Sequence, residues 1–261
     1  MKEAILSIDL GTMGVKVAVV NFEGVIEDFA YREYPIITEE EGQAEQDPTL
    51  WWNGIVNCAK ELTDKHGELR KRVKAISLCG QMHTHVYLGS NFKPLGNAIT
   101  WLDQRSSSII SKWNLEGITK ELFEATWIAP TTTYTVPQIC WTRENRKKIY
   151  EKTYKILIAK DYIKYLLTKK LVTDPSDASG TAVFDIRTND WSEEAFKLVD
   201  IKTKLFPEIQ PSTSVMGYLT KEAANILNIE QGIPVINGGS DHSVAEIGSG
   251  LLKEGRISCI L

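Results

Sequence analysis

Residues 4–21 read AILSIDLGTMGVKVAVVN and predict two strands joined by a tight turn. Ala4–Asp9 is an apolar run that ends in an aspartate, and Val15–Asn21 is rich in the β-branched residues that favour strands. The two glycines of the intervening DLGTMG allow the backbone to reverse within a few residues. A third strand, Val25–Tyr34, follows a short turn, so the chain is predicted to open with three antiparallel strands.

A helix and a fourth strand come next and define the kind of sheet. In the segment 47–66, Asp47 suits the N-cap, Pro48 suits the first helical position, and apolar residues recur at helical spacing. Val73–Gly80 (VKAISLCG) then reads as a buried strand. Because the helix lets this strand return in parallel beside the first, the sequence predicts a mixed sheet, the arrangement of the ribonuclease-H-like fold.

The rest of the chain is mostly helical and contains no internal repeat or low-complexity linker. We expect one α/β domain with inserted helices, rather than two independent domains. Helices are predicted at Asp103–Trp113, Thr119–Ala125, Val136–Lys152, Lys160–Leu167, Glu193–Val199 and Lys221–Leu227, and strands at Lys155–Ile158, Thr181–Ile186 and Ile233–Asn237.

Composition excludes several classes of function. A formal net charge of −4 gives no electrostatic reason to expect a nucleic acid or an anionic membrane as partner. The N-terminus does not resemble a signal peptide, and no window approaches the roughly 18 apolar residues of a membrane span. The four cysteines have no metal-ligand spacing and indicate reduced thiols, so a soluble cytoplasmic protein is expected; they are Cys58, Cys79, Cys140 and Cys259.

The turn after the first strand is a candidate phosphate site. Its backbone N–H groups and the Thr12 hydroxyl could surround phosphate oxygens while Asp9 holds Mg²⁺ through water. A plain hairpin, in which the same side chains satisfy local hydrogen bonds, explains the residues equally well. The sequence has no Walker A, G-x-G-x-x-G or H-E-x-x-H pattern, so a P-loop or Rossmann route to a nucleotide is excluded.

The sequence GQMHTH (residues 80–85) follows the fourth strand, where ligands usually bind in α/β sheets. Gln81 and His83 are suited to hydrogen-bonding hydroxyl groups, and Met82 could pack against the carbon face of a sugar. His83 and His85 are spaced to share one face of a strand, but a third metal ligand is missing from the sequence nearby.

ITWLDQRS (residues 99–106) places Trp101, Asp103 and Arg105 at a strand-to-helix corner, where they could form a sugar-binding wall with polar clamps. A buried tryptophan and a capping aspartate are the alternative. TDPSDASGT (residues 173–181) is turn-rich and acidic, and a structural role is favoured there because Asp and Ser commonly cap turns.

Asp241 lies in GGSDHS, where a strand leads into a helix that begins near His242. A helix N-terminus stabilises an anion, so we expect Asp241 to be ionised at neutral pH and able to accept a proton from an attacking hydroxyl. An N-cap role is the alternative. Gly238 and Gly239 favour the catalytic interpretation, because they would let another molecule approach the backbone closely.

The motifs together are more specific than any one of them. DLGTMGVKVAVV, QDP with WW, GQMH, WLDQR, AKDY, SDASGT and GGSDH occur in this order, and the set resembles the FGGY family of carbohydrate kinases, most closely its xylulokinase branch. Members have two actin-like, ribonuclease-H-like domains, with sugar and ATP meeting in the cleft between them. The resemblance implies ATP-dependent phosphorylation of a sugar, D-xylulose or a related ketose or polyol, with Mg²⁺ as cofactor.

The resemblance also implies roles for individual residues. Asp241 would be the general base, and Asp9 would place the Mg²⁺. The ATP phosphates would be bound by Gly11, Thr12 and Lys16. The sugar would be bound or bordered by Gln81, Met82, His83, Trp101, Asp103, Arg105 and His242.

The chain departs from the family in two respects. His242 stands where Asn is common, and Thr84–His85 where small residues are common, which leaves the identity of the sugar open. Family members are also about twice as long. We therefore expect residues 1–250 to be the sugar-binding domain and 251–261 to begin an absent C-terminal ATP-binding domain, with Ile257–Leu261 as its first strand.

Three further possibilities stay open from sequence alone. The chain could be a non-catalytic sugar-binding or sensing module, or another member of the actin and chaperone superfamily without a sugar role. A homodimer is also an open alternative. As an isolated half, the chain is expected to bind sugar weakly and to transfer phosphate poorly.

Overall fold

The computed structural model describes residues 2–258. Its first strands pair as the sequence predicts: β1 is antiparallel to β2, β2 is antiparallel to β3, and the strand after the first long helix lies parallel to β1. These elements are β1 (Ala4–Leu10), β2 (Gly14–Asn21), β3 (Ile26–Glu33), α1 (Pro48–Lys65) and β5 (Val73–Gly80).

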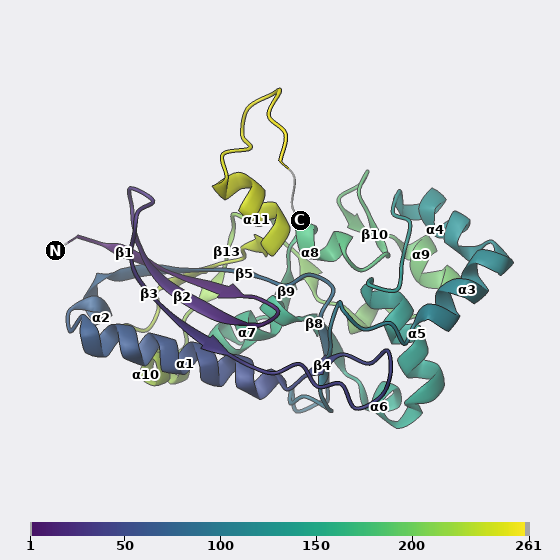
Figure 1. Ribbon diagram of the computed structural model, residues 1–261, viewed down its shortest axis with the longest axis horizontal. Coiled ribbons are helices and arrows are strands. Elements are labelled where there is room, and N and C mark those ends of the chain that lie inside the picture. Colours follow the sequence, from purple (N-terminus) through teal and green to yellow (C-terminus); the bar gives the residue numbers. More distant parts are fainter. Residues whose placement is uncertain (1, 259–261) are drawn as a thin grey trace.

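Three later strands complete a seven-stranded mixed sheet (Figure 1). They are β13 (Val215–Tyr218), β14 (Pro234–Ile236) and β15 (Gly239–Ser240). The order is β13-β14-β5-β1-β2-β3, and β15 continues beside β5 after β14. The carboxyl ends of β1, β5 and β15 therefore meet at one edge of the sheet.

Side-chain alternation along β1 decides which face of the sheet is covered. Leu6, Ile8 and Leu10 are buried on the side of α1, whereas Asp9 lies on the opposite, half-open face. On the covered side, α1 packs with α7 (Ala159–Thr168) and α10 (Lys221–Leu227), and α11 (Asp241–Gly248) lies across the other side (Figure 1).

Helix α1 begins where the sequence predicts. The Asp47 carboxylate accepts a hydrogen bond from the N–H of Thr49 at 2.8 Å, and Pro48 occupies the first turn. Trp51, Ile55 and Leu62 follow at helical spacing and are buried against β2 and β3.

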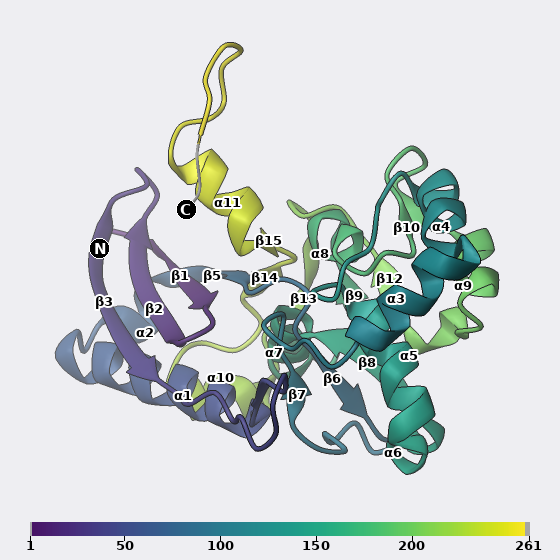
Figure 2. The same cartoon turned by 45° about the vertical axis from the view of Figure 1, so that its right-hand side comes forward.

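The inserted region forms a second layer with its own core (Figure 2). A four-stranded sheet of order β4-β7-β6-β8 joins it to the main sheet. The strands are β4 (Glu45–Gln46), β6 (His85–Leu88), β7 (Ala98–Ile99) and β8 (Lys155–Ile158), and the helices are α3 (Ser107–Glu116), α4 (Ile118–Thr126), α5 (Thr135–Asn145), α6 (Lys147–Lys152) and α9 (Glu193–Leu198).

Two predicted helices are wrong in extent. The single helix expected at Val136–Lys152 is broken at Arg146, whose φ of −123° is not helical and whose guanidinium lies 2.7 Å from Glu45. The helix expected from Asp103 begins at Ser107 instead, because Asp103 lies in a buried turn and accepts a hydrogen bond from the N–H of Ala44.

The segment 173–191 also differs from prediction. A short helix, α8 (Pro175–Ser179), forms where a turn was expected, because Asp174 caps it by accepting from the N–H of Ser176 at 3.0 Å. The strand expected at Thr181–Ile186 is limited to β10 (Phe184–Asp185), which pairs with β11 (Asp190–Trp191).

The remaining short elements were not predicted, because two are single helical turns and the other two are a strand pair whose partners are distant in sequence. They are α2 (Leu69–Arg72), a 3₁₀ turn η1 (Thr203–Leu205), and the parallel pair β9 (Val172–Thr173) and β12 (Glu208–Ile209). Residues 249–258 form neither helix nor strand, and Cys259–Leu261 of the strand expected at Ile257–Leu261 lie outside the described residues.

Within residues 2–258, no helix is both long and apolar enough to cross a bilayer. The cysteines of the same range, Cys58, Cys79 and Cys140, are free thiols; Cys58 and Cys140 are buried, and Cys79 is partly exposed. Cys259 lies outside the described part of the chain.

Candidate active site

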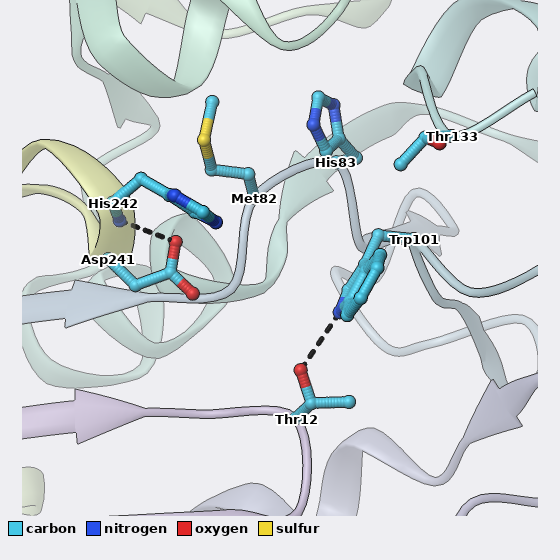
Figure 3. A pocket seen from close by; sticks show the side chains of 7 residues that line it. All are labelled: Thr12, Met82, His83, Trp101, Thr133, Asp241 and His242. Carbon is cyan, nitrogen blue, oxygen red and sulfur yellow. Dashed lines mark hydrogen bonds between the residues drawn. The ribbon is translucent and has the colours of Figure 1, made fainter. Parts of the chain in front are cut away.

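A pocket of about 250 Å³ opens at the sheet edge where β1, β5 and β15 end (Figure 3). Its lining combines loops that are far apart in sequence. The lining residues are Thr12, Met82, His83, Trp101, Thr133, Asp241 and His242. Six of these seven are residues that the sequence singled out, and Thr133, in the connection before α5, is the one it missed.

Trp101 forms one wall of the pocket and is held at both ends. Its indole Nε1–H donates to the hydroxyl of Thr12 at 2.8 Å (Figure 3), and its backbone N–H donates to the hydroxyl of Thr84 at 3.2 Å. The side chain is still 38% exposed, so part of the ring faces the solvent-filled space. An aromatic face held in this way can pack against the C–H groups of a ligand.

His83 has a fixed tautomer. Its Nδ1 lies 2.7 Å from the carbonyl oxygen of Gly180, which can only accept, so Nδ1 carries the proton and Nε2 is an acceptor. Burial lowers the pKa of the imidazole, which keeps the ring neutral at pH 7. His83 also has a φ of +63°, a conformation rare outside glycine that the contact with the Tyr134 ring, 4.9 Å away, helps to hold.

Asp241 is the first residue of α11, one position beyond the N-cap. Its carboxylate accepts a hydrogen bond from the N–H of His242 at 2.8 Å (Figure 3). Burial raises the pKa of Asp241 despite this hydrogen bond, and the charge of Asp9 raises it further. The pKa of Asp241 is therefore raised overall. The sequence predicted the opposite effect, because a helix dipole would lower this pKa.

Gly238 is required by the chain's own packing, and the expectation that Gly238 and Gly239 admit another molecule stays a prediction. Gly238 has a φ of +75°, and a Cβ there would lie 1.9 Å from the carbonyl oxygen of Leu78. Gly239 pairs with Cys79 of β5. The loop therefore presses directly onto β5, and this contact brings Asp241 to the pocket.

Of the residues predicted to bind metal and phosphate, Thr12 lines the pocket, whereas Asp9, Gly11 and Lys16 lie outside the lining. Asp9 is opposite Lys16 in the β1–β2 register, and its carboxylate accepts a weak hydrogen bond from the thiol of Cys79 at 3.4 Å. Gly11 is in the turn between the strands, where its N–H donates to the carbonyl oxygen of Gly14 at 3.1 Å. Asp9 is near enough to Asp241 for its charge to raise the pKa of that carboxyl.

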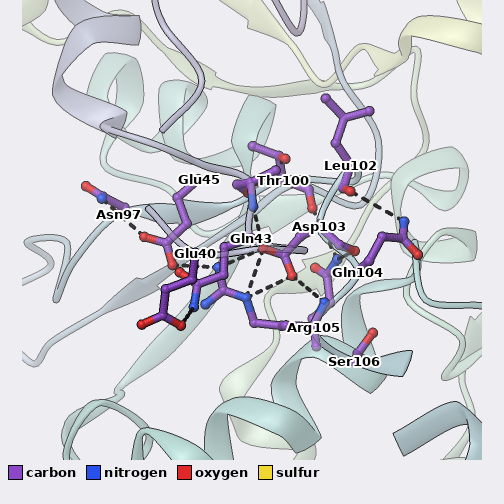
Figure 4. A network of polar contacts seen from close by, with 12 residues as sticks. Glu40, Gln43, Glu45, Asn97, Thr100, Leu102, Asp103, Gln104, Arg105 and Ser106 are labelled. Carbon is purple, nitrogen blue, oxygen red and sulfur yellow. Dashed lines mark hydrogen bonds and ion pairs between the residues drawn. The ribbon is translucent and has the colours of Figure 1, made fainter. Parts of the chain in front are cut away.

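Two residues expected at the sugar lie behind the pocket. Asp103 is fully buried and binds the guanidinium of Arg105 through both carboxylate oxygens, at 2.7 to 2.9 Å (Figure 4). Arg105 also lies 2.8 Å from Glu45. These contacts hold the segment that contains β4 against the corner that contains Trp101. Asp103 and Arg105 therefore support the pocket without lining it.

Gln81 is likewise buried and outside the lining, which corrects its predicted place. Its amide donates to the side-chain oxygen of Gln46 at 2.9 Å, and the amide of Gln46 donates to the carbonyl oxygen of Thr12 at 2.6 Å. The hydroxyl of Thr84 donates to the Gln81 oxygen at 2.9 Å. Gln81 thus links the Thr12 turn to the residue that holds the Trp101 backbone.

A buried cluster of charged side chains lies behind Asp241 and was missed at the level of sequence. It consists of Lys160, Asp161, Lys164, Asp174 and Asp177, all with side chains of 0% exposure. The Lys160 ammonium lies 2.7 Å from Asp174 and 3.1 Å from Asp177. The available signal was the run ILIAKDYIKYLL (residues 156–167), which places Lys160, Asp161 and Lys164 among apolar residues, together with the acidic segment TDPSDASGT.

The cluster already contains its own cation. Carboxylate oxygens of Asp161, Asp174 and Asp177 lie within 4.8 Å of one another, a spacing that could suit a metal, but the Lys160 ammonium lies among them. Burial alone would lower the pKa of Lys160, and the surrounding carboxylates outweigh it and raise the pKa. Burial raises the pKa of Asp177 to about 8, which favours the protonated form of this carboxyl at neutral pH.

Comparison with known proteins agrees with this geometry. The N-terminal domain profile of the FGGY family of carbohydrate kinases matches residues 4–248. The xylulose kinase of Lactococcus lactis is 32% identical over 250 residues, which cover 96% of this chain and 50% of that protein. The xylulose kinase of Staphylococcus xylosus is 31% identical over 251 residues, with coverages of 96% and 51%.

Solved structures confirm the predicted fold class. The gluconate kinase from Lactobacillus acidophilus has a TM-score of 0.90 at 28% identity, covering 96% of this chain and 50% of that one. The ligand-bound xylulose kinase from the same species has a TM-score of 0.90 at 29% identity, with coverages of 95% and 50%. The chain therefore has the actin-like, ribonuclease-H-like fold of these proteins and spans about half the length of the relatives it matches.

Proposed function

The chain belongs to the FGGY family of carbohydrate kinases, and on that premise we propose that it is the sugar-binding half of an ATP-dependent kinase for D-xylulose or a related ketose or polyol. Residues 1–250 would be the N-terminal domain, and 251–261 would begin a C-terminal ATP-binding domain. The observation that carries the proposal is the convergence of Asp241, His83 and Trp101 on one pocket.

In this proposal Asp241 accepts the proton of the sugar hydroxyl that attacks the γ-phosphate of ATP. A carboxyl whose pKa is raised by burial is a better proton acceptor than an exposed one, while its position at the pocket wall orients the hydroxyl. Neutral His83 can accept a hydrogen bond from a second hydroxyl through Nε2. The Trp101 ring offers its face to the carbon side of the sugar.

ATP and Mg²⁺ would be bound at the adjoining turn between β1 and β2. The donor set fits a magnesium ion that keeps most of its water, because Asp9 is a half-buried carboxylate on the open face of the sheet. Gly11, Thr12 and Lys16 are the candidates for the phosphates. When bound, Mg²⁺ would neutralise the negative charge of the phosphate oxygens.

The relatives favour xylulose as the sugar. Both of the compared curated proteins are named xylulose kinases, whereas one of the structural neighbours is a gluconate kinase. His242, next to Asp241 in the pocket, is one of the residues at which this chain departs from the family pattern. Gluconate is therefore the substrate to test against D-xylulose.

A non-catalytic sugar-binding module is not favoured, because the named relatives are kinases. A cytoplasmic location forms part of the proposal, since the cysteines within residues 2–258 are free thiols and ATP is available there.

The test is a coupled assay of ADP production by the full-length protein, across ketoses, polyols and gluconate. We expect Asp241→Asn to lower kcat by about 10² to 10⁴-fold, the usual contribution of general base catalysis, while the sugar still binds with wild-type affinity in isothermal titration calorimetry. Asp200→Asn is the matched control, because the Asp200 side chain is 98% exposed and does not line the pocket. Full activity of Asp241→Asn would exclude the general-base role.

The 261-residue chain alone provides a second readout. It is expected to bind the sugar and to turn over poorly, because in this proposal the second half of the phosphate-binding arrangement belongs to the C-terminal domain. Turnover equal to that of the full-length protein would contradict the proposed division into two domains.

A further inference from the structure

The backbone that delivers Asp241 is held by a chain of hydrogen bonds from α8. The N–H of Ser240, the residue just before Asp241, donates to the hydroxyl oxygen of Ser176 at 2.9 Å. The Ser176 hydroxyl in turn donates to the carboxylate of Asp174. Since its proton is used on Asp174, the Ser176 oxygen must present a lone pair to Ser240, so both roles of the hydroxyl are fixed.

Asp174 is a rigid anchor for this chain. It is fully buried, and one of its oxygens lies 2.7 Å from the Lys160 ammonium. The other oxygen accepts from the backbone N–H of Ser176 at 3.0 Å and from the hydroxyl of Ser212 at 3.0 Å. A buried carboxylate with an ammonium ion and several donors around it has little freedom to move.

The same anchor holds the preceding residues of the loop. Lys160 donates to the carbonyl oxygen of Asn237 at 3.3 Å, and the N–H of Gly238 donates to the carbonyl oxygen of Ser212 at 2.9 Å. On its other side the loop lies against β5, where Gly238 leaves no room for a side chain. The loop is thus clamped between β5 and α8, which lies beside β15 and the start of α11 (Figure 2).

We propose that Ser176 is a positioning residue for Asp241: the Asp174–Ser176–Ser240 hydrogen-bond chain fixes the carboxylate at the reacting hydroxyl. This inference rests on the proposed function, because it assumes that Asp241 is the base. Ser176 itself does not line the pocket, so it acts through the Ser240 backbone. An error of about 1 Å in such a group can cost on the order of 100-fold in rate.

The first test uses the 261-residue chain and does not depend on activity. In Ser176→Ala, the Ser240 N–H loses its acceptor, and its hydrogen exchange, followed by ¹⁵N NMR, should become about 10-fold faster. Ser179→Ala is the matched control, because Ser179 lies in the same helix and its hydroxyl donates to the Ser176 carbonyl oxygen at 2.8 Å. Equal Ser240 exchange in both variants would overturn the proposal.

The second test measures steady-state kinetics of the full-length protein. Ser176→Ala should lower kcat by about 10-fold or more and change the KM for sugar by less than about 3-fold, because positioning acts on the transition state. Ser176→Thr, which keeps the hydroxyl, should recover most of the loss. Because a smaller active fraction also lowers the apparent kcat at an unchanged KM, kcat is expressed per folded molecule, with the folded fraction measured by circular dichroism. A merely structural role would leave this corrected kcat at the wild-type value.

The outcomes separate the two claims. A wild-type protein without sugar-dependent ADP production would overturn the proposed function and this role with it. A wild-type kinase that loses activity in Asp241→Asn but is unaffected by Ser176→Ala would overturn only the positioning role. Loss of kcat in Ser176→Ala with wild-type activity in Ser179→Ala would support it.

Discussion

Replacing Lys160 by methionine tests how much the buried cluster contributes to stability. The substitution keeps the length of the side chain and removes its charge. In the wild-type chain the ammonium lies 2.7 Å from Asp174, 3.1 Å from Asp177 and 3.5 Å from Asp161, and all four side chains have 0% exposure. In Lys160→Met these carboxylates stay buried, with Lys164 as the nearby ammonium of the cluster.

The size of the effect follows from what each carboxylate retains. Removing one partner of a buried ion pair typically costs about 3 to 5 kcal/mol. Asp161 keeps Lys164 at 2.8 Å, and Asp174 keeps the donors from Ser176 and Ser212. Asp177 can remain protonated, because burial raises its pKa. We therefore expect the lower end of the range, a loss of about 3 kcal/mol.

Urea denaturation of the 261-residue chain at pH 7, followed by tryptophan fluorescence, measures this free energy of unfolding. Lys197→Met, at a side chain that is 79% exposed, should stay within about 0.5 kcal/mol of wild type. Lys160→Met combined with Asp174→Asn should recover part of the loss, because it removes the unpaired charge. A loss below about 1 kcal/mol in the single variant would refute the view that Lys160 compensates the buried carboxylates.

Two further predictions concern the loop and the cluster. Gly238→Ala should lower the free energy of unfolding by more than about 2 kcal/mol in the same urea assay, because its Cβ would lie 1.9 Å from the Leu78 carbonyl oxygen. Gly24→Ala is the control, because Gly24 has a φ of +81° but an added Cβ there would have no atom within 4 Å; the free energy of unfolding should fall by about 1 kcal/mol from backbone strain alone. Equal losses of unfolding free energy in the Gly238 and Gly24 variants would contradict the steric argument. Burial raises the pKa of Asp177 from 3.8 to about 8, so the folded chain holds a proton that the unfolded chain releases, and stability should fall as the pH rises through this window. Asp177→Asn should reduce that slope by up to about 1.4 kcal/mol per pH unit between pH 4 and 8; an unchanged slope would show that Asp177 is ionised among Lys160, Lys164, Asp161 and Asp174.

Much of the fold was predictable because its signals are local. The alternation of Ala4–Asp9, the β-branched run Val15–Asn21 and the Asp47–Pro48 cap each depend on residues close in sequence. The helix at Lys221–Leu227 has the predicted bounds for the same reason. Where a boundary depends on a distant partner, as with Arg146 and Glu45, the sequence predicted a longer helix than the chain forms.

The candidate site was predicted in part. Thr12, Met82, His83 and Asp241 follow strands or turns that the pattern predicts, and the carboxyl ends of such strands meet at one edge. Gln81, Asp103 and Arg105 have the same polar character, but their side chains turn inward to hold the pocket from behind. The sequence shows that a residue is of a type that can bind a sugar. The orientation of its side chain depends on the residues that pack around it.

The sequence by itself determined the order of strands and helices and the type of residue at each loop, because backbone propensity and hydrophobic periodicity act over a few residues. The tertiary structure alone decided which of the polar residues face the pocket. It also decided that Gly238 packs directly on β5, and that Lys160 and Asp174, which are 14 residues apart in sequence, meet and brace the Asp241 loop. Those outcomes depend on the desolvation of charges and on close contact between distant backbones, which exist only once the chain has folded.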